Sequence, residues 1–266
     1  MIESDEIEKY KTARLKGGRR VHGKKGETRE TGRGVKPATV NRDLACMKAM
    51  YNYFISLGVI VKNPVAKVKL LPENNNQTRV LSFEEERLYL AACGQPLYDI
   101  AVLMLETGMR PDEIYRMKRE NVNLVAGFVF NPHGKTKAAR RKLTLTNRAA
   151  DVLKLRMLTI EGDYLFPSAD PAKPMPSADR LHNAALELSG IDHCRLYDLR
   201  HTFCTRAVEA GVDLVTLAAL CGHSRIQMVL RYAHPTEEHQ VKAIRKMEEY
   251  TIARQMEDIG MAATVQ

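Results

Sequence analysis

The chain has 266 residues, 44% of them apolar, which suffices to fill the core of one large domain or of two modest ones. Its 41 lysines and arginines exceed the 32 aspartates and glutamates, and the formal net charge of +9 favours a polyanionic partner, most commonly a nucleic acid. A membrane span is excluded because no apolar run approaches the roughly 20 residues needed to cross a bilayer, and the polar, acidic opening MIESDEIEKY does not resemble a signal peptide.

Positive charge is densest near the N-terminus. Residues 9–33 hold ten lysines and arginines against two glutamates, with glycines scattered from position 17 onward. This composition predicts a mobile basic arm that either contacts phosphate groups or is simply solvated, and the charge density favours phosphate contact.

The segment 36–60 predicts the first clear helix. Thr39 or Asn41 can cap its start. Arg42 and Lys48 lie on this segment, and we expect them to face DNA. Apolar residues recur every three or four positions and form one stripe, made of Leu44, Met47, Met50, Tyr51 and Phe54.

A polar segment then divides the chain. PENNNQTR, residues 72–79, begins with proline and shows no periodicity, which is typical of an interdomain linker. We therefore expect a helical N-terminal domain over 1–74, including the basic arm, and a second domain over 75–266.

The second domain is predicted to be mainly helical with one small antiparallel sheet. Ser82 and Glu85 fit a capping box at the start of one helix. Residues 125–146 alternate with a period of two, which predicts a hairpin whose loop, HGKTKAARR, is strongly basic. Further helices are expected over 98–106, over 111–118, from 147 onward and in several pieces between 196 and about 256.

Two segments place an arginine where it suits an anion. Arg110 precedes a helix that starts at Pro111, so its guanidinium and the free N–H groups of the helix start would face the same space. Alternatively, Arg110 and Glu113 form a surface ion pair of little energetic weight. In RLYDLRHTF, spacings of three and four bring four residues to one helical face, namely Tyr197, Arg200, His201 and Cys204.

The segment GHSRIQMVLRYAHP ends a predicted short helix on a tyrosine. Ser224 can cap this helix, and Ile226, Val229 and Leu230 are expected to face inward. Tyr232 does not extend that stripe neatly, so we expect it to be partly free to present its hydroxyl, the alternative being an ordinary buried tyrosine. A phenol with a pKa near 10 needs neighbouring cations and a proton acceptor to act as a nucleophile.

Four motifs in order resemble those of the tyrosine recombinases, also called phage integrases: TGMRPDEI, KTKAARRKLTL, YDLRHTF, and LCGHS followed by RYAH. Upstream, TVNRDLACMKAMYNYFISLGVIVKNPV and RVLSFEEE resemble that family's core-binding domain and the start of its catalytic domain. The resemblance implies a helical core-binding domain followed by a tyrosine-recombinase catalytic domain. Because residues 1–35 are few and basic, we expect them not to form an arm-binding domain of the kind that phage integrases often carry.

The resemblance assigns a role to each matching residue. Arg110 and Arg200 would clamp the scissile phosphate, since planar guanidiniums bind phosphate oxygens in pairs and stay charged. Glu113 would hold the site together, and His223 would donate a hydrogen bond to the phosphate. Tyr232 would be the nucleophile, giving a 3′-phosphotyrosyl link to DNA.

The basic hairpin would supply the general acid and further DNA contacts. Lys135 matches the lysine that protonates the leaving 5′ oxygen, and Lys137 competes with it because the loop is one residue longer than the common form. Lys137, Arg140 and Arg141 are also expected to bind DNA.

One position departs from the family pattern, because Tyr197 stands where the second box usually begins with histidine. A phenol can hydrogen-bond phosphate but is a poor general base at pH 7. His201 is common in the family motif, but a helix, which turns about 100° per residue, points it away from that position. We expect reduced dependence on this base; the alternative is a catalytically weak, recombinase-like DNA-binding regulator.

The implied reaction needs no cofactor, because the tyrosyl bond stores the energy of the phosphodiester. The five cysteines and eight histidines are dispersed, so we expect reduced cytosolic thiols and no metal site. The resemblance implies a specific site on double-stranded DNA, homotetramers, integration or excision of a phage or mobile element, and a place at the bacterial nucleoid in the cytoplasm. Residues 237–260 would dock on a neighbouring copy or close intramolecularly.

Two other classes of function compete with this interpretation. The segment VDLVTLAALCGHSRIQMVLRY resembles a helix–turn–helix, which would suit a non-enzymatic regulator. That alternative does not explain why Arg110, Lys135 and Arg200 follow the recombinase order. A topoisomerase of the same chemistry differs mainly in not joining two DNA sites.

Overall fold

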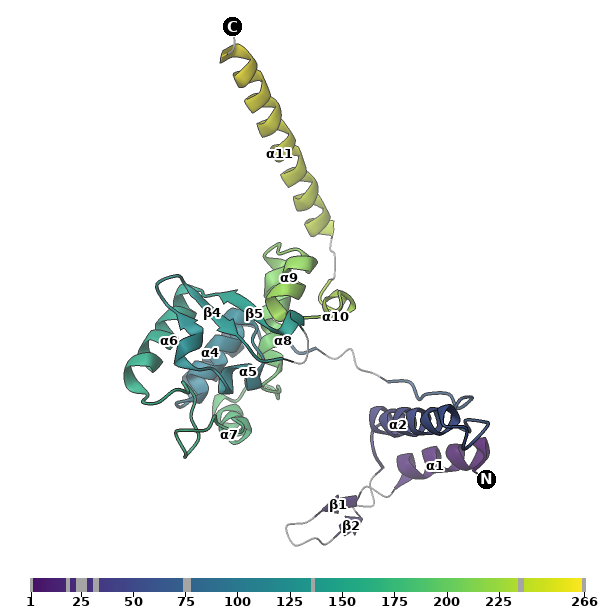
Figure 1. Ribbon diagram of the computed structural model, residues 1–266. Coiled ribbons are helices and arrows are strands. Elements are labelled where there is room, and N and C mark those ends of the chain that lie inside the picture. The colour runs from purple at the N-terminus through teal and green to yellow at the C-terminus, as the bar shows by residue number, and fades with distance from the viewer. Residues whose placement is uncertain are drawn as a thin grey trace. The chain divides into compact units, whose positions relative to one another are not determined.

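The computed structural model describes residues 2–17, 20–22, 28–30, 34–73, 78–134, 137–233 and 237–264. The chain divides into two compact units, Met1–Gln77 and Thr78–Gln266, each with its own buried apolar cluster. Figure 1 labels most of their elements. None of the helices within the described ranges is long and apolar enough to span a bilayer.

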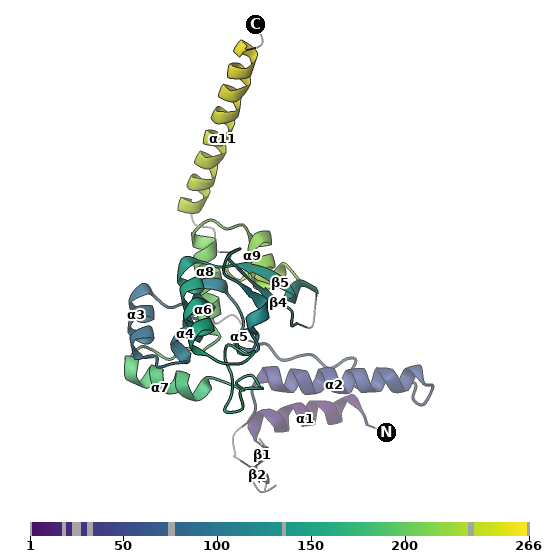
Figure 2. The ribbon, with the colours of Figure 1, turned by 60° about the vertical axis from the view of Figure 1, so that its left-hand side comes forward.

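The first unit is built on two helices that lie side by side in Figures 1 and 2, α1 (Ser4–Lys16) and α2 (Pro37–Ser56). Polar contacts join them as well, since Asp43 of α2 accepts hydrogen bonds from Tyr10 at 2.9 Å and Arg14 at 3.2 Å. The buried core of the unit consists of Ile7, Val40, Leu44 and Val65.

Helix α1 corrects the prediction of a mobile basic arm for residues 9–16. Its only buried residue is Ile7, so its charged sequence lacks the apolar stripe that identifies a helix. A two-stranded antiparallel pair follows, made of β1 (Arg20–His22) and β2 (Thr28–Glu30). The remainder of the predicted arm, at 18–19, 23–27 and 31–33, lies outside the described residues.

The start of α2 differs from the predicted caps at Thr39 and Asn41. The helix begins at Pro37, which suits a first position because its missing N–H would be unpaired there anyway. Asn41 lies inside the helix, where its Oδ1 accepts from the Leu71 N–H at 2.8 Å and its Nδ2 donates to the Leu71 carbonyl at 2.9 Å. The side chain thereby fastens the outgoing chain to α2. Of the predicted apolar stripe, Met50 and Phe54 remain exposed.

The second unit contains the other helices and a three-stranded sheet (Figure 2). The first group of helices is α3 (Phe83–Ala92), α4 (Leu97–Thr107), α5 (Pro111–Tyr115), α6 (Asn147–Thr159) and α7 (Asp179–Ser189). The second group is α8 (Asp198–Glu209), α9 (Leu214–Cys221), α10 (Gln227–Leu230) and α11 (Glu237–Thr264). The antiparallel sheet runs β3 (Val122–Asn123), β4 (Phe128–Asn131) and β5 (Arg141–Thr144) in that order.

Helix α4 is the centre of this unit, because almost all of its residues are buried and it packs against both α6 and α8. The predicted capping box starts α3, with Ser82 Oγ accepting from the Glu85 N–H at 3.1 Å and Glu85 accepting from the Ser82 N–H at 2.9 Å. The predicted fold class, mainly helical with a small antiparallel sheet, is confirmed. The helix predicted over 111–118 ends earlier, at Tyr115, because Lys118 forms a β-bridge with Tyr164.

Candidate active site

The C-terminal end of α9 gathers three arginines. The carbonyls of residues 220–222 have no partner within the helix and carry the negative end of its dipole. Arg141 Nε donates to the first of these carbonyls at 2.6 Å, Arg200 Nη2 to the second at 2.6 Å and Arg110 Nη2 to the third at 3.4 Å. The helix end therefore brings together cations from β5, from α8 and from the start of α5.

Glu113 is the carboxylate that pairs with two of these arginines. Its Oε1 accepts from Arg110 Nη1 at 2.9 Å and from Arg141 Nη1 at 3.1 Å. Its Oε2 accepts from the Arg110 N–H and from Arg141 Nη2, both at 3.0 Å. Burial opposes ionisation, but the bonds from Arg141 and Arg110 outweigh it and lower the pKa of Glu113. The carboxylate is thus ionised at neutral pH and fixes both guanidiniums.

Arg141, which was expected to bind DNA, is buried against Glu113, and its contact with DNA stays a prediction. Alternate residues of β5 face inward, and Arg141 is one of them, with its guanidinium bonded to Glu113 and to two backbone carbonyls. Gly222 allows this approach, because it has φ +62° and a Cβ there would lie 2.7 Å from Arg141 Nη1. Arg140 is the exposed residue at this point of the chain.

The side chains of Arg200 and His223 are in direct contact. Arg200 Nη1 donates to the Gly108 carbonyl at 2.5 Å, and its Nη2 lies 2.9 Å from His223 Nε2. Burial, reinforced by the charges of Arg200 and Arg110, lowers the pKa of His223 to about 4. The imidazole is therefore neutral at pH 7, and since Arg200 donates to Nε2 its proton sits on Nδ1.

Two polar atoms at this point are buried and lack a hydrogen-bond partner among the residues that the structure describes: Arg200 Nε and His223 Nδ1. Native proteins rarely leave such atoms unsatisfied. Both atoms are N–H donors, so the group that would complete them is an acceptor, as a phosphate oxygen is.

The described conformation is closed over Arg200. This side chain has no exposed surface, so an oxygen as large as a water molecule cannot reach it. Tyr197, 36% exposed, lies over it with its ring centre 5.9 Å from the guanidinium carbon. A phosphate can first meet Arg110, whose side chain is 28% exposed, and reaches Arg200 only after the covering side chains move.

Tyr232 is buried, which corrects the expectation that its hydroxyl is partly free. Only 5% of the residue is exposed, and its Oη lies 2.5 Å from His201 Nδ1. Burial raises the pKa of Tyr232 above its usual range. The short helix α10 ends at Leu230, and the turn after it directs Tyr232 inward through a bond from its N–H to the Val229 carbonyl at 2.9 Å.

The start of α10 also differs from the prediction. Ser224 does not cap it, because Ile226 occupies the cap position and no side chain bonds the free N–H groups. Of the three residues expected to face inward only Val229 is buried, while Ile226 and Leu230 are exposed.

The predicted general acid and several DNA contacts are placed as follows. Lys135 lies outside the described residues. Lys137 starts the 3-10 helix η2 (Lys137–Ala139), but its side chain is outside them too, so the choice between the two lysines stays a prediction. Arg42 and Lys48 are exposed on α2 of the first unit, and their contact with DNA stays a prediction.

The model of the phage integrase family matches residues 79–239, which include every predicted catalytic residue. The chain belongs to the phage integrase family. This confirms the resemblance drawn from the four motifs. Within the described ranges, no three His, Cys, Asp or Glu side chains gather so that they could hold a metal ion.

Similarity to individual curated proteins covers more of the chain than the family model does. The integrase of Escherichia phage P2 is 34% identical over 217 residues, which cover 79% of this chain and 59% of that protein. A tyrosine recombinase of Agathobacter rectalis is 28% identical over 222 residues, covering 75% of this chain and 72% of the relative. The chain therefore spans about three fifths of the length of the P2 integrase.

Solved structures of integrases share the fold. The Tn1549 transposon integrase in complex with transposon right end DNA has a TM-score of 0.73 at 20% identity, covering 93% of this chain and 86% of that one. A lambda integrase tetramer bound to a Holliday junction has a TM-score of 0.67 at 19% identity, covering 88% and 65%. At these identities the likeness concerns the fold alone.

Two buried histidines of the candidate site give a pH-dependent stability that thermal unfolding can measure. His201 and His223 both have a pKa of about 4 in the folded chain, chiefly through burial, whereas an unfolded histidine titrates near 6.5. Unfolding therefore takes up protons between these values, and stability is expected to fall as the pH falls from about 6.5 to about 4. Replacing both histidines with asparagine should reduce this dependence of stability on pH. An unchanged dependence would contradict the lowered pKa values of His201 and His223.

Proposed function

We propose that this member of the phage integrase family is a site-specific DNA recombinase that cuts and rejoins strands through a 3′-phosphotyrosyl intermediate on Tyr232. The observations that carry the proposal are the gathering of Arg110, Arg200 and His223 at the end of α9, with two unpaired donors, and a Tyr232 hydroxyl close enough for the charge of Arg200 to act on its pKa. The residues come from four separate segments, so their meeting is a property of the fold.

The reaction follows from what each group can do. Arg110, Arg200 and His223 donate to the non-bridging oxygens of the scissile phosphate and stabilise the charge that builds up in the transition state. The Tyr232 oxygen forms a bond to phosphorus as the bond to the 5′ oxygen breaks. The leaving 5′ oxygen takes a proton from Lys135 or Lys137. The 5′ hydroxyl of another strand then attacks the phosphotyrosine, reverses these steps and releases Tyr232.

A second candidate function has its own observation. Arg200 has no exposed surface and Tyr232 is buried, so in this conformation the site cannot cut DNA unless it opens. Together with Tyr197 in the position of the usual histidine, this favours a catalytically weak DNA-binding regulator as the alternative.

The proposal extends to assembly on DNA. We propose that the protein binds a specific double-stranded site as a homotetramer, integrates or excises a phage or mobile element, and acts on nucleoid DNA in a bacterial cytoplasm. Helix α11 supports the assembly because it exposes large apolar side chains, among them Ile244, Met247 and Met256. These would be covered by a neighbouring copy, or by the same copy as the alternative.

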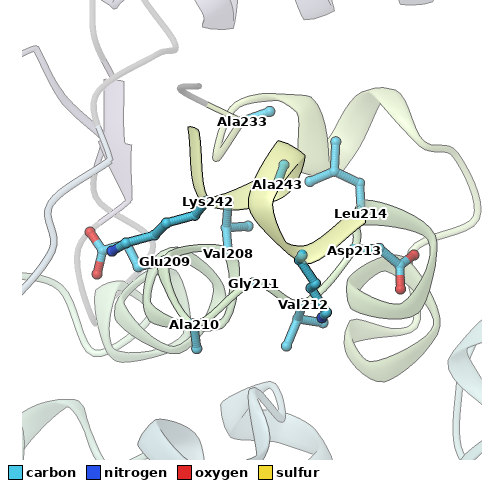
Figure 3. A pocket seen from close by; sticks show the side chains of 11 residues that line it. Val208, Glu209, Ala210, Gly211, Val212, Asp213, Leu214, Ala233, Lys242 and Ala243 are labelled. Atoms are coloured by element: carbon cyan, nitrogen blue, oxygen red, sulfur yellow. The ribbon is translucent and has the colours of Figure 1, made fainter. Parts of the chain in front are cut away.

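The start of α11 also lines a pocket of about 610 Å³ (Figure 3). Residues 208–214, where α8 turns into α9, form its opposite wall. None of the candidate catalytic residues lines this pocket, which suits a contact between protein segments better than a role in the chemistry.

A covalent-trapping assay tests the proposed reaction. The protein is incubated in EDTA with supercoiled plasmid that carries the DNA flanking its gene, and the mixture is quenched with detergent. We expect a protein–DNA adduct with the unaltered chain and none with Tyr232→Phe, because phenylalanine has no nucleophilic oxygen. Tyr250→Phe is the matched control, since Tyr250 is an exposed tyrosine on α11.

Each other outcome has a definite meaning. An adduct that persists in Tyr232→Phe contradicts Tyr232 as the nucleophile. Tight DNA binding without any adduct supports the regulator instead. If Tyr197→His then produces an adduct, the tyrosine in place of the usual histidine at position 197 explains why the unaltered chain does not cleave DNA.

A further inference from the structure

The proposed reaction lacks a proton acceptor for its nucleophile. A phenol with a pKa near 10 attacks phosphorus slowly unless a base removes its proton. Burial raises the pKa of Tyr232 further, so the need is greater here than for an exposed tyrosine. The residue at the position of the usual base, Tyr197, is itself a phenol.

His201 lies where such an acceptor is required. Its Nδ1 is 2.5 Å from Tyr232 Oη, and both residues are buried. His201 follows Arg200 directly on α8, so the helix holds the imidazole at a fixed place relative to that guanidinium. Arg200 acts on the same phenol, since its charge works to lower the pKa of Tyr232. The Tyr232 hydroxyl is therefore close enough to Arg200 to sense its charge while it touches His201.

Three other polar groups of this part of the unit are not available to take its proton. His223 Nε2 already faces a donor, Arg200 Nη2 at 2.9 Å, and its other nitrogen carries the proton. The adjacent Cys221 sulfur, 3.3 Å away, and burial raise the pKa of Cys204, which remains a thiol. Asp198 is engaged by Arg195, which donates to both of its carboxylate oxygens.

We propose that His201 is the catalytic general base of this site, with its Nδ1 accepting the phenolic proton as Tyr232 attacks the phosphate. The inference rests on the proposed recombinase function. The O–H electron pair of Tyr232 becomes the new bond to phosphorus, and the pair of the breaking P–O bond leaves on the 5′ oxygen. His201 carries one proton on each nitrogen after cleavage and returns the Nδ1 proton to Tyr232 when the strands are rejoined.

The charges around His201 suit this cycle. Burial is the main reason why its pKa lies at about 4; Asp198 raises that pKa, while Arg195, Arg231 and Arg200 lower it. The uncharged polar groups that face it are the phenols of Tyr197 and Tyr232. His201 is therefore a neutral acceptor at pH 7, and a phosphate placed against Arg200 offsets one of the positive charges that lower its pKa, which makes the imidazole more basic.

A second tyrosine–histidine pair in the same unit provides a contrast. Tyr89 Oη lies 2.7 Å from His182 Nδ1, and His182 Nε2 lies 2.9 Å from the Cys194 carbonyl. That carbonyl fixes the His182 tautomer, so the pair is a satisfied core contact. Among the described residues nothing is bonded to Nε2 of His201, which leaves this imidazole able to hold a second proton.

His201→Asn tests the role with little change in packing, because the asparagine Oδ1 replaces Nδ1 as a hydrogen-bond acceptor but does not accept the proton. The full chain is mixed with the same flanking DNA, and adduct formation is timed in a single turnover. We expect the cleavage rate to fall about 10²-fold or more while DNA binding stays within about threefold. His182→Asn, the matched control, should lower the unfolding temperature and leave the cleavage rate of folded protein unchanged.

A sulfur-substituted DNA separates the base from the general acid. When the scissile 5′ oxygen is replaced by sulfur, the leaving group has a pKa of about 8.5 and departs without a proton. A variant that has lost the general acid, Lys135→Ala or Lys137→Ala, should therefore cleave this DNA about as fast as the unaltered chain does. We expect His201→Asn to stay slow on this DNA, with a rate that rises about tenfold per pH unit, because hydroxide must now form the phenolate. The unaltered chain should be nearly insensitive between pH 6 and 8.

The outcomes separate the inference from the function on which it rests. Adduct formation by the unaltered chain together with an unchanged rate in His201→Asn overturns the role of His201 and leaves the recombinase function intact. A faster rate in His201→Asn also overturns it, since His201 would then only hold Tyr232 back. If the unaltered chain forms no adduct on either DNA, the recombinase function itself fails, and the inference with it.

Discussion

Arg200→Lys is expected to lower the single-turnover rate of covalent DNA cleavage by about 10³-fold, the loss typical of removing a positioned transition-state donor. Lysine keeps the charge but presents a single nitrogen in place of a planar fork. Arg200 uses that fork in the structure, since Nη1 binds the Gly108 carbonyl, Nη2 reaches Cys221 and His223, and Nε remains unpaired for a ligand. One ammonium cannot reproduce these directions.

The rate is measured with purified protein on the plasmid described above, together with the affinity for the same DNA. Arg195→Lys is the matched control, because Arg195 precedes the same helix, its side chain is 61% exposed, and its contacts go to Asp198. It should cleave at the unaltered rate. A rate within about threefold of the unaltered chain in Arg200→Lys would show that the guanidinium geometry does not contribute to the chemistry.

Arg141→Met is expected to lower the free energy of unfolding by about 3–5 kcal/mol, the usual cost of removing one partner of a buried ion pair. Arg141 and Glu113 are both only 7% exposed and bond through both carboxylate oxygens. Without Arg141, the Leu220 carbonyl at the end of α9 also loses its donor. Because Glu113 fixes Arg110 as well, cleavage should fall even at temperatures where the variant is folded.

Urea unfolding at pH 7 measures this effect and shows whether the pair acts as a unit. Glu113→Gln should cost a similar amount, and the double variant should cost less than the sum of the two, since no unpaired buried charge remains. Additive costs would contradict a direct interaction. Arg116→Met is the control: Arg116 and Asp112 form an exposed pair with side chains 51% and 68% exposed, and its loss should cost about 1 kcal/mol or less.

Local patterns in the sequence were sufficient to predict many elements of the second unit. The capping box at Ser82 and Glu85, the helix around α4 and the hairpin of β4 and β5 depend on interactions between residues near in sequence, and all are present. In the first unit, the local pattern does not predict helix α1, because α1 is charged along most of its length and buries only Ile7. Its helix is stabilised by contacts with α2 that the local pattern does not contain.

The order and spacing of Arg110, Arg200, His223 and Tyr232 identified the family and the candidate chemistry without coordinates, because those features survive in the linear chain. Which groups touch was decided only by tertiary structure. The end of α9 supplies three backbone carbonyls to three arginines, which turns Arg141 inward and makes it a partner of Glu113. Likewise the turn after α10 buries Tyr232 against His201, a contact across 31 positions of the chain. Backbone carbonyls and burial have no signature in residue identity, so these contacts required the packed fold.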